Sequence, residues 1–270
     1  MRLNKYLSES GQWSRREADR LIEEGRVTVN GAPAVLGTQL ADGDEVAVDG
    51  DIVGGARKKI RPVYIALNKP VGITCTTERS VPGNIVDFVD HPERVFPIGR
   101  LDKDSEGLIF LTNDGDIVNE ILRAENAHEK EYVVAVDKSV DLEHVTAMSS
   151  GMKLSAGEIT KRCKIEKLGP KVLRFTLTQG LNRQIRRMCA AFGYEVVALQ
   201  RIRIMNVQLG HLPVGRWRNL TPQELEGLLP KHRPAAAAKP APSGRPAQSG
   251  RPAPARGGQP RHPPPSRRRR

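Results

Sequence analysis

The chain has 270 residues, a formal net charge of +12 and three cysteines, Cys75, Cys163 and Cys189. The charge excess lies in residues 231–270, which hold 11 Lys and Arg residues and no acidic residue, whereas the first 230 residues hold 32 basic against 31 acidic side chains. This pattern excludes a uniformly basic body, the sparse cysteines exclude a disulfide framework, and no apolar run approaches a membrane span, so we expect a cytoplasmic protein with no membrane partner.

Residues 1–61 are expected to form a small module of two helices on a short sheet, followed by a linker. Apolar side chains recur at helical spacing over residues 3–7, and Ser14-Arg15-Arg16-Glu17 is a capping box that begins a second helix. Alternating residues then lead into Asn30-Gly31, which is a strong hairpin signal. Residues 51–62 are rich in glycine and basic side chains, as is typical of a linker.

Basic side chains gather on or beside the two predicted helices of this module. Together with the amides at the start of the second helix they would suit the phosphates of a nucleic acid, although a solvated charged face is the alternative. The order of residues 2–7, 14–19 and 25–31 closely resembles the S4-type RNA-binding domain. This resemblance favours RNA binding, with the candidate contacts Arg2, Lys5, Arg15, Arg16 and Arg20.

Residues 62–230 form the second and larger unit, and its central feature is a polar loop between two short apolar runs. The runs Arg94–Ile98 and Leu108–Leu111 are predicted strands, and Asp102 lies between them with Arg100 and Lys103 as near neighbours. Flanking cations favour the ionised carboxylate, and an ionised carboxylate suits a nucleophile. The alternative is an aspartate that only caps a turn.

The elements after this loop mix helices and strands in irregular order. Because they do not alternate strictly as strand and helix, we predict an α+β domain with a mostly antiparallel mixed sheet flanked by helices. The predicted helices are residues 117–122, 142–148, 182–193 and 221–229, and the predicted strands are 130–136, 172–177 and 195–207.

The helix predicted over residues 182–193 carries three arginines on one face, Arg183, Arg186 and Arg187, at spacings of three and four. Three like charges repel one another, so an anion should compensate them. A phosphate, or Asp102, or both would do so, and a purely solvated arginine face is the alternative.

Residues 231–270 form the third unit, a tail with ten prolines and four terminal arginines. Such a composition cannot bury enough apolar surface to fold, so we expect a disordered tail. Its charge would add salt-sensitive, nonspecific affinity for RNA, and the alternative is an extension without function.

Three segments occur in order behind the S4-like module: Gly99–Leu108, Glu129–Tyr132 and Leu181–Met188. In this order they resemble the RsuA/RluB/RluE/RluF family of ribosomal RNA pseudouridine synthases. Within that family, residues 66–73, 84–89 and 128–132 are most similar to the RluF branch. The similarity extends from residue 2 to about residue 229.

The resemblance implies isomerisation of uridine to pseudouridine in RNA without a cofactor, and we expect no metal site because the histidines and cysteines lack ligand spacing. It implies that Asp102 is the nucleophile, which attacks either C6 of uracil or C1′ of ribose. It also implies that Tyr132 stacks on the uracil and helps to remove the C5 proton, and that Arg186 pairs with the nucleophile.

Three further roles follow from the same resemblance. Arg100 is expected to fill the gap left by the extruded base, and Lys69 and Arg183 are candidate phosphate contacts. The expected substrate is 23S ribosomal RNA. A tRNA anticodon uridine is the alternative substrate, and a noncatalytic RNA-binding ribosome-assembly factor is the alternative function. Nothing in the sequence suggests an obligate oligomer, so we expect a monomer.

Overall fold

The computed structural model describes residues 1–53, 61–122, 128–155 and 157–228. The expectation of a disordered tail over residues 231–270 therefore lies outside the described residues. Most of the expected linker, residues 54–60, also lies outside them. The predicted domain boundary, between residues 61 and 62, follows directly after this segment. No helix within the described ranges is both long enough and apolar enough to cross a membrane.

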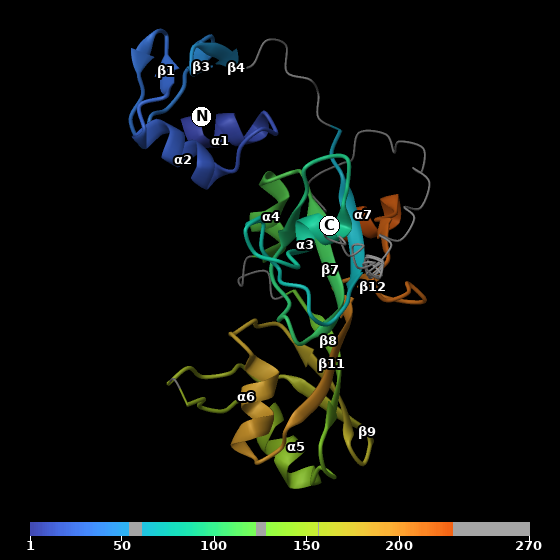
Figure 1. The fold of residues 1–270 in the computed structure, drawn as a ribbon. Coiled ribbons are helices and arrows are strands. Elements are labelled where there is room, and N and C mark those ends of the chain that lie inside the picture. Colours follow the sequence, from blue (N-terminus) through green and yellow to red (C-terminus); the bar gives the residue numbers. More distant parts are fainter. Residues whose placement is uncertain (54–60, 123–127, 156, 229–270) are drawn as a thin grey trace, which may run out of the picture.

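The amino-terminal module consists of two helices packed on a small antiparallel sheet (Figure 1). Its second helix begins with the predicted capping box, because the Ser14 side chain accepts from the Glu17 amide at 3.1 Å and the Glu17 carboxylate accepts from the Ser14 amide. Leu3, Leu7 and Ile22 are buried between the helices and the sheet. The elements are α1 (Leu3–Glu9), α2 (Arg15–Glu23), β1 (Val27–Val29), β2 (Ala32–Pro33), β3 (Val46–Val48) and β4 (Asp51–Val53), with the strand order β2-β1-β3-β4.

The larger domain is built on a nine-stranded mixed sheet with helices packed against it. Every strand pair is antiparallel except β7 with β11, which confirms the predicted α+β class with a mostly antiparallel sheet. The strand order is β13-β5-β7-β11-β8-β10-β9, with β6 pairing to β7 and β12 to β11.

The elements of this domain are β5 (Tyr64–Lys69), α3 (Ile85–Val89), β6 (Phe96–Ile98), β7 (Glu106–Thr112), α4 (Asp116–Leu122), β8 (Lys130–Val136), α5 (Leu142–Ser149), β9 (Lys164–Gly169), β10 (Val172–Leu177), α6 (Gln184–Ala191), β11 (Val196–Ile204), β12 (Val207–Gln208), β13 (Trp217–Asn219) and α7 (Pro222–Leu228). The strand predicted over 195–207 ends earlier, because Met205 takes a left-handed turn at φ 52° that sends the chain back into β12.

The sheet has two halves joined at a narrow parallel junction. Figure 1 shows β7 with α3, α4 and α7 in the upper half, and β8, β9, β11, α5 and α6 in the lower half. Between them β7 and β11 share only two residue pairs, Gln200 with Glu106 and Arg201 with Gly107. We call these two pairs the seam. One apolar cluster crosses it on the face that carries α5 and α6, since Ile109 of β7 and Val134 of β8 belong to the same core.

The amino-terminal module contacts the upper half of the larger domain through two ion pairs. The Lys5 ammonium lies 2.5 Å from a carboxylate oxygen of Asp116, the first residue of α4. The Arg94 guanidinium lies 3.0 Å from Glu17. The Glu17 carboxylate therefore has two roles: it caps α2, and it contacts the larger domain.

Candidate active site

Asp102 lies in the loop between β6 and β7, just before β7 enters the seam. A tight turn follows it, in which the Ser105 amide donates to the Asp102 carbonyl at 3.1 Å. The Asp102 side chain is half-buried, and within the described part of the chain its carboxylate accepts no hydrogen bond and forms no ion pair. Its charge still acts on its surroundings, because it favours the protonated forms of Lys69 and Arg183. The carboxylate is therefore near cations yet not tied to a partner.

The backbone of this loop is held by a second segment, residues 72–75. The Cys75 thiol donates to the Leu101 carbonyl at 3.1 Å and accepts from the Leu101 amide at 3.4 Å. Burial raises the pKa of this thiol, so it stays a protonated donor. The Gly72 amide donates to the Lys103 carbonyl at 2.7 Å. The residues on both sides of Asp102 are thus fixed through their backbone, which leaves its side chain available for chemistry.

Arg183 and Arg186 contact this loop through Asp104 rather than through Asp102, whereas Arg187 pairs with Glu158 at 2.6 Å. Arg183 donates to both carboxylate oxygens of Asp104, at 3.0 and 2.8 Å, and these hydrogen bonds lower the pKa of Asp104. Arg186 reaches the same carboxylate at 3.3 Å and donates to the Asp104 carbonyl at 2.9 Å. The anion predicted for this helix is therefore present, but the expected pairing of Arg186 with Asp102 is not the observed one. The turn after Asp102 brings Asp104, two residues on, to the start of α6.

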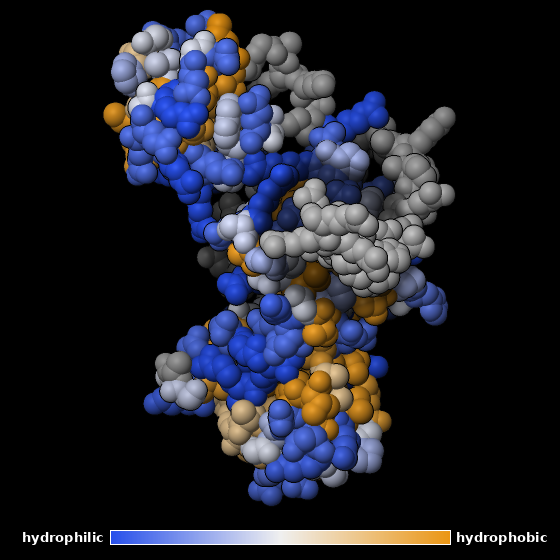
Figure 2. All heavy atoms as spheres, viewed as in Figure 1, coloured by the Kyte–Doolittle hydropathy of each residue, from blue (hydrophilic) through white to orange (hydrophobic). Residues whose placement is uncertain are grey.

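Arg183 is also the residue that directly precedes α6. It adopts a left-handed backbone conformation at φ 48°. Such a conformation costs a non-glycine residue about 1 kcal/mol, so the surrounding contacts must hold it. The double hydrogen bond to Asp104 is one such contact. Figure 2 shows a hydrophilic surface over the upper part of α6, next to the junction of the two halves.

Tyr132 lies on β8, on the other side of the seam from Asp102. Its side chain is 9% exposed and belongs to the same core cluster as Leu101, the residue before Asp102, and Ile185, the residue before Arg186. The cluster thus contains Tyr132 and the residues that directly precede Asp102 and Arg186, which come from three separate segments. The guanidinium carbon of Arg201 lies 6.0 Å from the centre of the Tyr132 ring.

Lys69 does not lie where a phosphate contact would be. Its side chain is completely buried, and its ammonium donates to the carbonyls of Pro70 at 2.8 Å and Ile73 at 3.0 Å. Burial lowers its pKa, and the charge of Arg201 lowers it further. The expected phosphate contact at Lys69 is therefore wrong in this structure, where the side chain holds the turn whose Gly72 amide donates to Lys103 in the Asp102 loop. Arg100, by contrast, is exposed, as its expected role requires.

The candidate RNA contacts of the amino-terminal module divide into two groups. Arg2, Arg15, Arg16 and Arg20 are exposed. Lys5 is half-buried and occupied by Asp116 and Glu9, and the hydrogen bond to Asp116 raises its pKa. The four arginines therefore stay candidates for phosphate contacts, whereas Lys5 joins the module to the larger domain. Within the described ranges, His, Cys, Asp and Glu side chains form no group of three or more that would hold a metal ion.

Three residues near Asp102 were not singled out from the sequence as site residues: Cys75, Asp104 and Arg201. Asp104 had a visible signal, since it is the second carboxylate in the same short loop. Arg201 also had one, because it is a charged residue inside the apolar run of β11. Cys75 had none, since a single cysteine in a polar segment is uninformative.

Comparison with known proteins gives consistent results for both domains. Residues 63–191 match the family described as RNA pseudouridylate synthase, and residues 1–53 match the S4 domain. The chain is 60% identical over 225 residues to the dual-specificity RNA pseudouridine synthase RluF of Escherichia coli (strain K12), covering 83% of this chain and 77% of that protein. It is 57% identical over 245 residues to the protein of that name from Salmonella typhi, covering 88% and 84%. A crystal structure of a pseudouridylate synthase superposes with a TM-score of 0.63 at 32% identity, covering 84% of this chain and 99% of that one.

Proposed function

Because this chain belongs to the RluF-like branch of the RsuA family of RNA pseudouridine synthases, we propose that it converts a specific uridine of 23S ribosomal RNA to pseudouridine with Asp102 as its nucleophile. The observation that carries the proposal is the loop around Asp102. Its neighbours on both sides are fixed through their backbone, while its own carboxylate is unpaired among the described residues. A preorganised and unpaired carboxylate is what a covalent step requires.

The reaction needs no group from outside the protein. The Asp102 carboxylate adds to C6 of the uracil or to C1′ of the ribose, and the bond between N1 and C1′ breaks. The base then rotates and C5 bonds to C1′. Asp102 leaves in that step if it was bonded to C1′, and afterwards if it was bonded to C6. C5 loses its proton and N1 takes one up, so the product has the same composition as uridine. The protein therefore has to supply a nucleophile, a surface on which the base rotates and an acceptor for the C5 proton.

Tyr132 and Arg186 are the proposed partners of Asp102 in this reaction. The Tyr132 ring lies in the core cluster that includes Leu101, which suits a platform for the uracil. Arg186 supports the loop through the Asp104 carbonyl and the Ser105 hydroxyl. In the RNA-free protein it therefore positions the loop as a whole. Arg100, exposed two residues before Asp102, is the proposed group that fills the gap left by the extruded uridine.

In this proposal, residues 1–61 bind the RNA and residues 62–230 catalyse the reaction. Extruding a nucleotide from a helix costs a few kcal/mol, and remote binding supplies part of that free energy. The exposed arginines of the amino-terminal module are suited to this role. The two ion pairs that join this module to the larger domain would keep the bound RNA near Asp102.

A second candidate substrate is a tRNA anticodon uridine. The relatives are named dual-specificity RNA pseudouridine synthases, which favours a second RNA substrate of some kind, and the tRNA uridine is the candidate for it. Mapping pseudouridines across total RNA, with and without the gene, tests both substrates together. We expect loss of a position in 23S RNA, and loss of a tRNA position as well if both are substrates. An unchanged map would contradict the proposal and favour a noncatalytic RNA-binding protein.

A further inference from the structure

The proposed reacting groups come from opposite sides of the seam. Asp102 precedes β7 in the upper half of the sheet, whereas Tyr132 lies on β8 in the lower half. Within the described ranges, β7 and β11 pair directly at two positions only, Gln200 with Glu106 and Arg201 with Gly107. A junction two pairs long fixes relative position poorly by its own hydrogen bonds. Additional contacts must therefore set the distance between the nucleophile and the tyrosine.

The Arg201 side chain makes such contacts from the middle of the seam. It is 4% exposed, and its Nε donates to the Leu108 carbonyl at 2.6 Å, on β7. One terminal nitrogen points to the Arg100 carbonyl at 3.4 Å, in the loop that carries Asp102. The same guanidinium lies 6.0 Å from the centre of the Tyr132 ring, and Arg201 is the direct β11 partner of Tyr132 on β8.

The backbone geometry allows little freedom at this point. Gly107 has φ 110°, and a Cβ on it would lie 2.6 Å from the Arg201 nitrogen and closer still to the Arg201 carbonyl oxygen. The main chains of β7 and β11 are therefore in close contact at Gly107 and Arg201. Since a planar guanidinium presents its donors in a fixed fork, its two carbonyl contacts define an orientation as well as a distance.

We propose that Arg201 is a positioning residue that spans the seam and fixes the Asp102 loop relative to the Tyr132 ring. It acts through the carbonyls of Leu108 and Arg100 and through its packing against the ring. The inference rests on the proposed roles of Asp102 and Tyr132. A misplacement of about 1 Å costs roughly 100-fold in rate, so the effect should fall on the chemical step.

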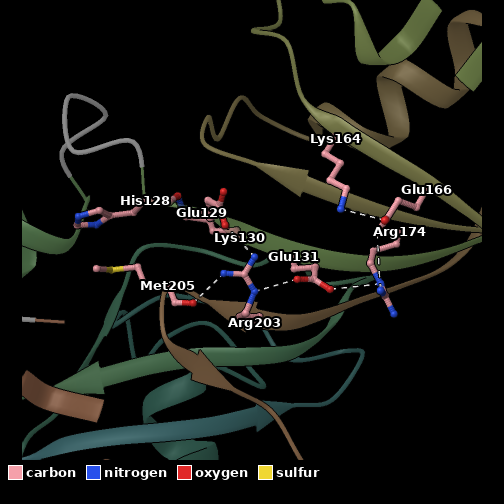
Figure 3. A network of polar contacts seen from close by, with 9 residues as sticks. All are labelled: His128, Glu129, Lys130, Glu131, Lys164, Glu166, Arg174, Arg203 and Met205. Atoms are coloured by element: carbon pink, nitrogen blue, oxygen red, sulfur yellow. Dashed lines mark hydrogen bonds and ion pairs between the residues drawn. The ribbon is translucent and has the colours of Figure 1, made fainter. Parts of the chain in front are cut away.

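The β11 strand offers a matched control. Arg203, two residues further on, donates to Glu131 at 2.8 Å, to Glu129 at 2.9 Å and to the Met205 carbonyl at 2.8 Å. Figure 3 shows it in a separate polar network that continues through Glu131 to Arg174. It is an arginine of the same strand with as many contacts, none of which reaches the Asp102 loop.

The experiment measures tritium release from RNA labelled at C5 of uridine, using total RNA from cells that lack the gene. Single-turnover rates of the full chain, held in excess over RNA, are followed against protein concentration. For Arg201→Gln we expect the maximal rate to fall about 30- to 100-fold, with the half-saturating protein concentration changed by no more than about twofold. Arg201→Lys should recover little, because one ammonium keeps the charge but cannot span both carbonyls. Arg203→Gln should keep the wild-type rate.

Thermal unfolding of each variant separates positioning from stability. Equal rate losses in Arg201→Gln and Arg203→Gln would overturn the proposal, as would full recovery in Arg201→Lys, because charge alone would then suffice. If Arg201→Gln does not fold, Arg201→Lys carries the test. Failure of both to fold would assign Arg201 to the fold and overturn the proposal. An active Asp102→Asn variant would instead contradict the proposed function, so the two failures are distinguishable.

Discussion

Gly107→Ala tests whether the close approach of β7 and β11 holds the two halves of the sheet together. Its added Cβ would meet the Arg201 nitrogen at 2.6 Å and the Arg201 carbonyl oxygen closer still, at a backbone φ of 110° that side chains rarely adopt. Backbone strain costs about 1–3 kcal/mol and overpacking a similar amount, so we expect a loss of about 4 kcal/mol. In a domain of this size that lowers the melting temperature by roughly 10 °C.

Calorimetry at pH 7 measures this loss, and Gly210→Ala is the matched control. Gly210 also has a positive φ, 56°, but a Cβ there would meet nothing within 4 Å. The control should lose only about 1 kcal/mol, which is the cost of the left-handed conformation alone. If Gly107→Ala were no less stable than Gly210→Ala, the close contact of β7 with β11 would not restrict which residue fits at position 107. The reasoning about these two strands would then be refuted.

Three further changes test other parts of the structure. Asp104→Asn removes the carboxylate that occupies Arg183 and Arg186, so RNA should bind more tightly and its salt slope should steepen by about 1; weaker binding would contradict this. Glu17 has a pKa lowered to about 2 by its hydrogen bonds to Ser14 and then by Arg94, so its contribution is present above pH 4.5 and is lost as the pH falls toward 2. Because Glu17 is half-exposed, Glu17→Gln should cost only about 1 kcal/mol in urea unfolding at pH 7 and less at pH 3, whereas an equal cost at both would be inconsistent. Deleting residues 231–270 removes 11 positive charges and should weaken RNA binding mainly at low salt, and an unchanged salt slope would remove the tail from RNA binding.

Local sequence patterns predict the features of this protein that depend on neighbouring residues. The capping box at Ser14 and Glu17 needs only four consecutive residues, and both of its hydrogen bonds are formed. The α+β class follows from the irregular order of strands and helices, which disfavours repeated parallel units. The need for an anion beside Arg183 and Arg186 also follows from local charge, since the sequence places three arginines at spacings of three and four.

The identity of that anion could not be read from the sequence. Asp102 and Asp104 are two residues apart, and which of them faces α6 depends on the turn closed by the Ser105 amide. Lys69 illustrates the same difficulty, because a lysine beside a turn is usually exposed. It is buried here because its ammonium finds two carbonyls within the turn.

Arg201 shows a third limit of sequence reasoning. Its partners Leu108 and Arg100 lie 93 and 101 residues away in the chain, so its role depends on how β7 pairs with β11. Parallel pairing between distant strands leaves no local pattern. The charge of Arg201 within an apolar strand is a signal that something polar must meet it, but the sequence does not say what.

The central claim is that the Asp102 carboxylate forms the covalent bond to uridine, and the Asp102→Asn variant tests it most directly. The substitution removes the charge and nearly keeps the shape, at a side chain that has no hydrogen bond to lose among the described residues. Tritium release from uridine-labelled total RNA of cells lacking the gene should fall to background, while RNA affinity and melting temperature stay nearly unchanged. Pseudouridine formation at the wild-type rate by the purified variant would contradict the account.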